Sequence, residues 1–289
     1  MNDTKVYKEL KNGKLKADVY YHGTRSPVIV YIHGGGLIFG TRKWLPSEQV
    51  EFFHCAGFSM ISIDYRLAPE SKIEAIIQDV RDALKWIRED AKEWYDFDLN
   101  QIILMGSSAG GYLSQLIGTE DSNIRAIVSF YGYGDILSNW IVEPSEHYRK
   151  KPIITESQAD EYVGNVEITQ GAMGRFNYYI SCRQHGIWMK KVTGYDHDTE
   201  RLSLEKYNPI SHLSKNFPPT LFLHGDQDTD VPYEQSVLMH SKLQDLGVYS
   251  ELIRIKGGEH VFDQNFHDPQ VQDAFDKVLE FLKVQLSLR

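Results

Sequence analysis

The sequence predicts an α/β protein with a mostly parallel central sheet. Short runs of consecutive apolar residues recur along the 289-residue chain, as expected of strands that are buried on both faces. Segments with the spacing of amphipathic helices lie between several of these runs. Alternation of strand and helix indicates crossover helices that cover the sheet.

The expected elements follow one another along the chain. A hairpin comes first, because apolar and polar residues alternate on both sides of Asn12-Gly13. Its strands are expected near Lys5–Leu10 and Leu15–Tyr21. Later strands are expected at Val28–Ile32, Ser59–Ile63, Ile102–Met105, Ile124–Phe130, Thr220–Leu223 and Glu251–Ile255. Helices are expected over Ile73–Ile87, Ala109–Ile117, Val237–Leu246 and Phe275–Leu286.

One region, residues 135–211, departs from this alternation and is rich in aromatic residues. A structureless loop of that length is uncommon inside a compact domain, so we expect a folded, helical insertion within a single domain of residues 1–289. A lid over a site is the preferred interpretation, and a purely structural cover is the alternative. Within it, Tyr178-Tyr179 and Trp188 are expected either to line a pocket or to form the core of the insertion.

Composition limits the classes of partner. The formal net charge is −9, which argues against nucleic acid, because phosphate binding depends on Lys and Arg. Cys55 and Cys182 are too few for a disulfide framework, which favours a reducing, cytoplasmic location. No apolar stretch approaches the roughly 18 residues of a membrane span, and the amino terminus has no signal-peptide core. The expected partner is therefore a small molecule.

A candidate nucleophile lies in the stretch Gly106–Gly110, which matches the pattern G-x-S-x-G with Ser108 at its centre. An expected strand precedes it and an expected helix follows it. A serine on such a turn has a strained backbone, and its hydroxyl is exposed beside helix amides that can receive negative charge. The alternative is a tight strand–helix turn with a buried serine.

A candidate anion site lies at His33-Gly34-Gly35-Gly36, after the strand Val28–Ile32. Successive glycines can turn their amides into a concavity that suits the oxyanion of an acyl-transfer reaction. The amide of Ala109, next to Ser108, is a further donor. The alternative is a flexible glycine turn.

A serine nucleophile needs a histidine as base and an acid that orients the histidine. His260 is the strongest candidate among 11 histidines, because it lies in a loop between an expected strand and the last expected helix. Three aspartates follow the strand Thr220–Leu223, and Asp228 is preferred, while Asp226 and Asp230 stay open.

Taken together, these stretches resemble α/β-hydrolases of the esterase and lipase group, and specifically the hormone-sensitive-lipase-like carboxylesterases. The matching stretches are His33–Gly36, Asp64–Glu70, Gly106–Gly111, Gly225–Asp228 and Gly257–His260. The order Ser108, Asp228, His260 is that of the family.

The resemblance implies an α/β-hydrolase fold with a mostly parallel sheet of about eight strands, flanking helices and a cap insertion. It implies Ser108 as nucleophile, Asp228 as orienting acid, His260 as base, and an oxyanion hole from the amides of Gly35, Gly36 and Ala109. In such families the segment Asp64–Glu70 mainly supports the oxyanion loop.

The chain also departs from this family. Members usually carry a cap before the glycine turn, whereas only 32 residues precede His33 here, most of them in the expected hairpin. Ser107 stands where the family commonly has Asp. We therefore expect the cap to come from residues 135–211, as in small acetyl- or feruloyl-type esterases, and the family's substrate pocket is not carried over.

The expected function is that of a serine carboxylesterase acting on small neutral esters, with no cofactor and no metal. Its expected partner is a small-molecule ester, and a homodimer is the assembly considered. One alternative is a small peptidase of the prolyl-oligopeptidase type, which would need a charged anchor for a peptide terminus. The other is a catalytically silent α/β-hydrolase that acts as a ligand receptor, against which the complete set Ser108, Asp228 and His260 argues.

Overall fold

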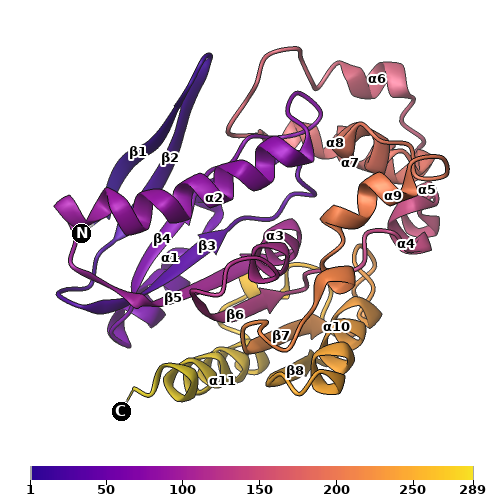
Figure 1. Cartoon of the computed structure of the whole chain (residues 1–289). Helices are drawn as coiled ribbons and strands as arrows, with labels where there is room; N and C mark the ends of the chain where they lie inside the picture. The colour runs from indigo at the N-terminus through magenta and orange to yellow at the C-terminus, as the bar shows by residue number, and fades with distance from the viewer. Residues whose placement is uncertain (1, 289) are drawn as a thin grey trace.

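Eight strands form one sheet in the order β1-β2-β4-β3-β5-β6-β7-β8 (Figure 1), in a computed structural model that describes residues 2–288. The strands are β1 (Asn2–Leu10), β2 (Gly13–Tyr20), β3 (Ser26–Ile32), β4 (Ser59–Ile63), β5 (Phe97–Ser107), β6 (Ile124–Phe130), β7 (Thr220–Gly225) and β8 (Ser250–Ile255). β2 pairs antiparallel with β1 and with β4, and every other neighbouring pair is parallel. The predicted mostly parallel sheet of about eight strands is confirmed.

Helices cover both faces of this sheet. The main ones are α1 (Ser47–Cys55), α2 (Ile73–Glu89), α3 (Ala109–Gly118), α10 (Glu234–Asp245) and α11 (Pro269–Leu286). Short 3-10 helices lie at Arg42–Trp44, Ala91–Glu93, Met173–Arg175, Glu205–Tyr207, Pro209–His212 and Phe262–Gln264. The helix α11 begins earlier than predicted because Asp268 caps it and Pro269 suits its first turn.

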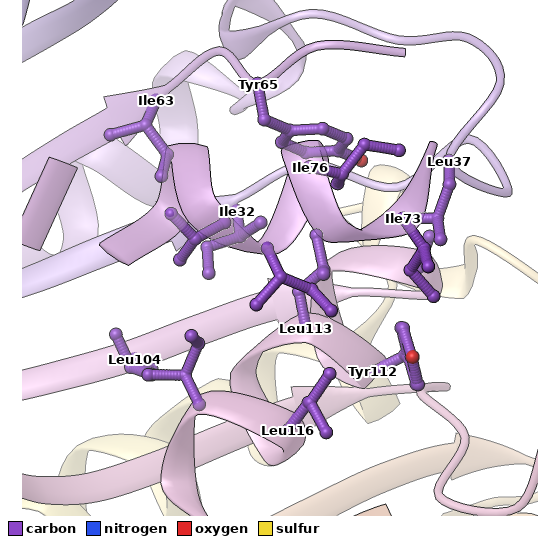
Figure 2. Close-up of a cluster of buried hydrophobic side chains, with 14 of the residues drawn as sticks. Ile32, Leu37, Ile63, Tyr65, Ile73, Ile76, Leu104, Tyr112, Leu113 and Leu116 are labelled. Carbon is purple, nitrogen blue, oxygen red and sulfur yellow. The ribbon is translucent and has the colours of Figure 1, made fainter. Parts of the chain in front are cut away.

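Strand alternation divides the core into two clusters. In β3, Val28, Val30 and Ile32 belong to the cluster that includes side chains of α2, α3 and α10, whereas Ile29 and Tyr31 belong to the cluster that includes side chains of α1 and α11. Figure 2 shows part of the first cluster, in which side chains of α2 and α3 meet side chains of the strands. Each fully buried aliphatic side chain there contributes about 1.5–3 kcal/mol.

The chain between β6 and β7 forms a series of short helices. They are α4 (Asn139–Val142), α5 (Glu146–Arg149), α6 (Glu156–Asp160), α7 (Phe176–His185), α8 (Trp188–Thr193) and α9 (Arg201–Leu204). In Figure 1 they gather to one side of the sheet. These helices lie within residues 135–211, and we use the name insertion for those residues.

Candidate active site

Ser108 occupies a sharp turn between β5 and α3. Its backbone has φ 52° and ψ −116°, a conformation that costs a non-glycine residue about 1–3 kcal/mol. The turn is held by the Ser108 amide, which donates to the Phe130 carbonyl at 2.8 Å. A Cβ atom at Gly110 would lie 1.8 Å from the Ile32 carbonyl oxygen, so only glycine permits this approach of helix and strand. Ser108 is only 7% exposed, and it lines a cavity.

The structure brings Ser108, His260 and Asp228 together. His260 Nε2 lies 3.1 Å from Ser108 Oγ, and His260 Nδ1 lies 2.6 Å from Asp228 Oδ2. Because the carboxylate can only accept, Nδ1 carries the proton and Nε2 is left to accept the serine hydroxyl. This is the geometry that a general base needs.

Asp228 is the aspartate that faces Nδ1. Its side chain is fully buried, and its Oδ1 accepts the amides of Asp230 and Val231 at 2.9 Å each. Asp226 binds Arg254 Nε at 2.7 Å instead, and Asp230 lies on the other side of the imidazole, 3.7 Å from Nε2.

Charges and hydrogen bonds shift the pKa of the Asp228 carboxyl and the pKa of the His260 imidazole. Burial alone would raise the pKa of Asp228, but hydrogen bonds from His224 and His260 outweigh burial and hold this pKa well below its usual range. Burial alone would lower the pKa of His260, but the hydrogen bond to Asp228 and the charges of Asp230, Asp228 and Asp263 raise it above its usual value. The acid is therefore ionised and the imidazole is a stronger base than a free one.

The glycine turn lines the same cavity as Ser108. The Gly35 carbonyl accepts the amides of Ile38 and Phe39 at 2.9 and 3.0 Å, so the Gly36 amide on the same planar peptide points the opposite way. Gly36 has φ 58°, and a Cβ atom there would lie 2.5 Å from the Tyr179 ring. The Ala109 amide is at the first turn of α3, where amides have no acceptor within the helix.

His33, before these glycines, is held as part of the turn. Its ring stacks on Tyr65 at a centroid distance of 4.2 Å, and its Nδ1 donates to the Gly34 carbonyl at 2.7 Å. Burial lowers the pKa of His33 to about 4, so the ring is neutral. The Tyr65 hydroxyl also donates to the His33 carbonyl at 2.8 Å, as expected of a segment that supports the glycine turn.

The chain is similar to proteins of a known family and to several solved structures. The BD-FAE family matches residues 18–243, more than half of the chain. The chain belongs to the BD-FAE family. Among solved structures, an α/β-hydrolase superfamily protein from Enterococcus faecalis superposes with a TM-score of 0.76 at 26% identity and covers 98% of each chain. The predicted α/β-hydrolase fold and the predicted hydrolase class are confirmed.

Other similar structures include a Staphylococcus aureus protein of unknown function, with a TM-score of 0.80, 25% identity and 98% of each chain covered. An esterase from Pyrobaculum calidifontis shares the fold, with a TM-score of 0.73, 23% identity, and 99% of this chain and 85% of that one covered.

Among curated relatives, the non-reducing polyketide synthase ausA of Emericella nidulans is 29% identical over 99% of this chain and 14% of its own length. The synthase prhL of Penicillium brasilianum is 28% identical, again over 99% of this chain and 14% of its own length. The chain thus spans about a seventh of the length of these curated relatives.

The site cavity of this BD-FAE family member measures about 460 Å³. Tyr148, Phe176 and Tyr179 of the insertion line it together with Phe39 and the residues that surround Ser108. Tyr179 therefore lines the cavity, which is one of the two arrangements expected for this residue from the sequence. Its neighbour Tyr178 and Trp188 do not line the cavity and are buried in the core.

The insertion is tied to the glycine turn by contacts of two residues, Trp188 and Arg175, that the sequence did not predict. Trp188 Nε1 donates to the Gly36 carbonyl at 2.9 Å. Arg175 donates from Nε to the Ile38 carbonyl at 2.7 Å and makes a two-point ion pair with Glu70 at 2.7 and 2.8 Å. A buried arginine leaves no recognisable pattern in sequence, so no motif could have marked these contacts.

A second missed group supports His260. The Tyr131 ring packs against the imidazole at a centroid distance of 4.6 Å, and its hydroxyl donates to Asp263 Oδ1 at 2.5 Å. Gln49 Nε2 donates to the other oxygen of Asp263 at 2.9 Å. Burial raises the pKa of this carboxyl.

Two further findings concern the described part of the chain. Within residues 2–288, no three His, Cys, Asp or Glu side chains are arranged to hold a metal ion. No helix in the same range combines the length and the apolar composition needed to cross a bilayer.

Proposed function

We propose that this protein is a serine carboxylesterase for small neutral esters, with Ser108 as nucleophile, His260 as base and Asp228 as orienting acid. One observation carries the proposal, namely the continuous hydrogen-bonded chain from Ser108 Oγ through His260 to Asp228 at 3.1 and 2.6 Å. The strained turn at Ser108 and the fully buried Asp228 support the same assignment, because both hold reactive groups in one geometry.

The reaction follows from these roles. Ser108 Oγ attacks the ester carbonyl carbon while its proton passes to His260 Nε2. The tetrahedral intermediate collapses, the bond from carbon to the alcohol oxygen breaks, and Nε2 returns the proton to the leaving alcohol. Water then attacks the acyl-enzyme with His260 again as base, which releases the carboxylic acid and restores Ser108. Asp228 stabilises the imidazolium that forms in each half.

The amides of Gly35, Gly36 and Ala109 are the proposed oxyanion hole. Each such donor is worth about 3–4 kcal/mol of transition-state stabilisation in related chemistry. The contacts of Gly36 with Trp188 and Tyr179 favour this role, because they keep the turn in one conformation before the substrate binds.

The cavity supports a small substrate. Its volume of about 460 Å³ and its aromatic walls suit a short acyl chain and a compact alcohol. Because Tyr148, Phe176 and Tyr179 supply part of the wall, we assign residues 135–211 the role of cap. A cytoplasmic location and a homodimer remain predictions from the sequence.

Hydrolysis of p-nitrophenyl acetate tests the proposal. We expect turnover by the wild type and a loss of about 10⁶-fold in kcat for Ser108→Ala. Ser241→Ala, which changes an exposed serine of α10, is the matched control and should match the wild type. Tight ligand binding without turnover would favour the receptor alternative, and activity on peptides but not on esters would favour the peptidase.

A further inference from the structure

A second carboxylate, that of Asp230, lies beside the imidazole of His260. Asp230 Oδ2 is 3.7 Å from Nε2, the nitrogen that faces Ser108, whereas Asp228 binds the opposite nitrogen. The Asp230 side chain is 14% exposed and lines the same cavity as Ser108. The mechanism proposed above needs one orienting acid, so this second carboxylate has no role in it.

The position of this carboxylate is fixed from the insertion. Oδ1 accepts the Tyr179 hydroxyl at 2.7 Å and Arg183 Nη1 at 2.9 Å. The Arg183 side chain, from α7, is only 2% exposed, and its Nη2 donates to the Trp140 carbonyl at 2.9 Å. Burial opposes the charge on Arg183, but Tyr179 and Asp230 keep its pKa above the usual value.

The two oxygens of Asp230 differ in what they bind. Oδ1 is saturated by Tyr179 and Arg183, whereas no residue within 2–288 donates to Oδ2 at 3.5 Å or less, and the Tyr148 hydroxyl is the other donor that faces Asp230. A carboxylate oxygen in a cavity keeps its water or gains a donor from the ligand, because its desolvation without a partner is costly. The cavity wall therefore holds one rigid, unpaired acceptor next to the catalytic nitrogen.

The place of Oδ2 indicates which part of the substrate it meets. His260 Nε2 must come within hydrogen-bond distance of the leaving oxygen to return the proton. Because Oδ2 lies beside the same nitrogen, it adjoins the alcohol part of the ester. A hydroxyl on the carbon next to the ester-bearing carbon can donate a hydrogen bond to Oδ2. An alkyl group at the same place would displace the water bound to Oδ2 and would provide no donor.

We propose that Asp230 is a specificity-determining residue that accepts a hydrogen bond from a free hydroxyl of the alcohol part, so that the preferred substrates are monoesters of 1,2-diols and larger polyols. This inference rests on the proposed function. A cationic alcohol is not favoured, because Arg183 already neutralises the charge of Asp230.

The test compares three related acetates on the wild-type protein. 2-Hydroxyethyl acetate and propyl acetate differ only in a hydroxyl against a methyl, and 2-methoxyethyl acetate has the oxygen without the donor. We expect kcat/KM for the hydroxyethyl ester to exceed both others by about 10-fold or more, as a hydrogen bond to a charged group provides. This comparison needs no variant, so it stands even if the variants below fold poorly.

Variants assign the effect to the residue. Asp230→Asn should reduce the preference to a few-fold at most, because an amide oxygen is a weaker acceptor than a carboxylate. Asp245→Asn, an exposed aspartate at the end of α10, should keep the wild-type preference. A preference that is undiminished in Asp230→Asn would assign the hydroxyl to another group and overturn the inference.

Failure of the inference and failure of the proposed function give different results. Equal rates on the three acetates, with p-nitrophenyl acetate hydrolysed, would overturn the role of Asp230 and leave the esterase standing. A preference for acetylcholine over 2-hydroxyethyl acetate would show recognition of charge and would also overturn the proposed role of Asp230. If no ester is hydrolysed, the esterase proposal falls, and the inference falls with it.

Discussion

Arg175 offers a quantitative test of how the insertion holds the glycine turn. Its side chain is 8% exposed and that of its partner Glu70 is 1% exposed, so the ion pair is buried. Replacement by methionine removes the positive charge and also the donors to the carbonyls of Ile38 and Ala68, at 2.7 and 2.6 Å. Among residues 2–288, Glu70 would keep a hydrogen bond only from the Gly164 amide, at 2.8 Å.

The expected loss of stability follows from the negative charge that Glu70 keeps when Arg175 is replaced. Removing one partner of a buried pair costs about 3–5 kcal/mol, because the other charge is left uncompensated. Since one amide still reaches Glu70, we expect Arg175→Met to lower the free energy of unfolding by about 3 kcal/mol. Adding Glu70→Gln should recover at least about 1 kcal/mol, because the uncompensated charge is then gone.

Urea unfolding followed by circular dichroism measures these free energies. Arg149→Met, an exposed arginine of α5 in the same insertion, is the matched control and should stay within about 0.5 kcal/mol of the wild type. The reasoning is refuted if Arg175→Met is within about 1 kcal/mol of the wild type, or if the double variant is less stable than Arg175→Met alone.

The remaining predictions concern the proposed catalytic groups. Activity on p-nitrophenyl acetate should fall as the pH drops, because a protonated His260 cannot accept the Ser108 proton. The pKa of His260 is raised, so the loss should begin above the pH at which an unperturbed imidazole, with a pKa of about 6.5, gains its proton; a kcat/KM that stays flat from about pH 8 to about pH 5 would contradict this. Asp228→Asn should lower kcat by about 10⁴-fold in the same assay, because the imidazole loses the carboxylate that selects its tautomer. An Asp228→Asn enzyme that keeps a tenth of its activity would exclude Asp228 as the orienting acid.

The strand–turn–helix at Ser108 was predictable because its cause is local. Glycines at Gly106 and Gly110 permit a close approach that larger residues forbid, and the flanking apolar runs mark the strand and the helix. The same holds for the turn at His33–Gly36, which follows a buried strand. His260 was identifiable from its loop position among the other histidines, several of which lie in helices or end a strand.

The choice among Asp226, Asp228 and Asp230 depended on the path of two loops. The Gln227 amide donates to the Gly258 carbonyl at 2.9 Å, which aligns the aspartate loop with the loop that carries His260. With three carboxylates so close in sequence, their spacing alone does not tell which one meets the imidazole.

The sequence by itself thus determined the class of fold and the types of group at the site, because periodicity and short glycine motifs act over a few residues. Only the tertiary structure decided what surrounds those groups. Trp188 meets Gly36 across 152 positions of sequence, and Arg175 meets Glu70 across 105. Such contacts arise from the packing of the insertion against the strand ends, and packing between distant segments leaves no periodic trace in the chain.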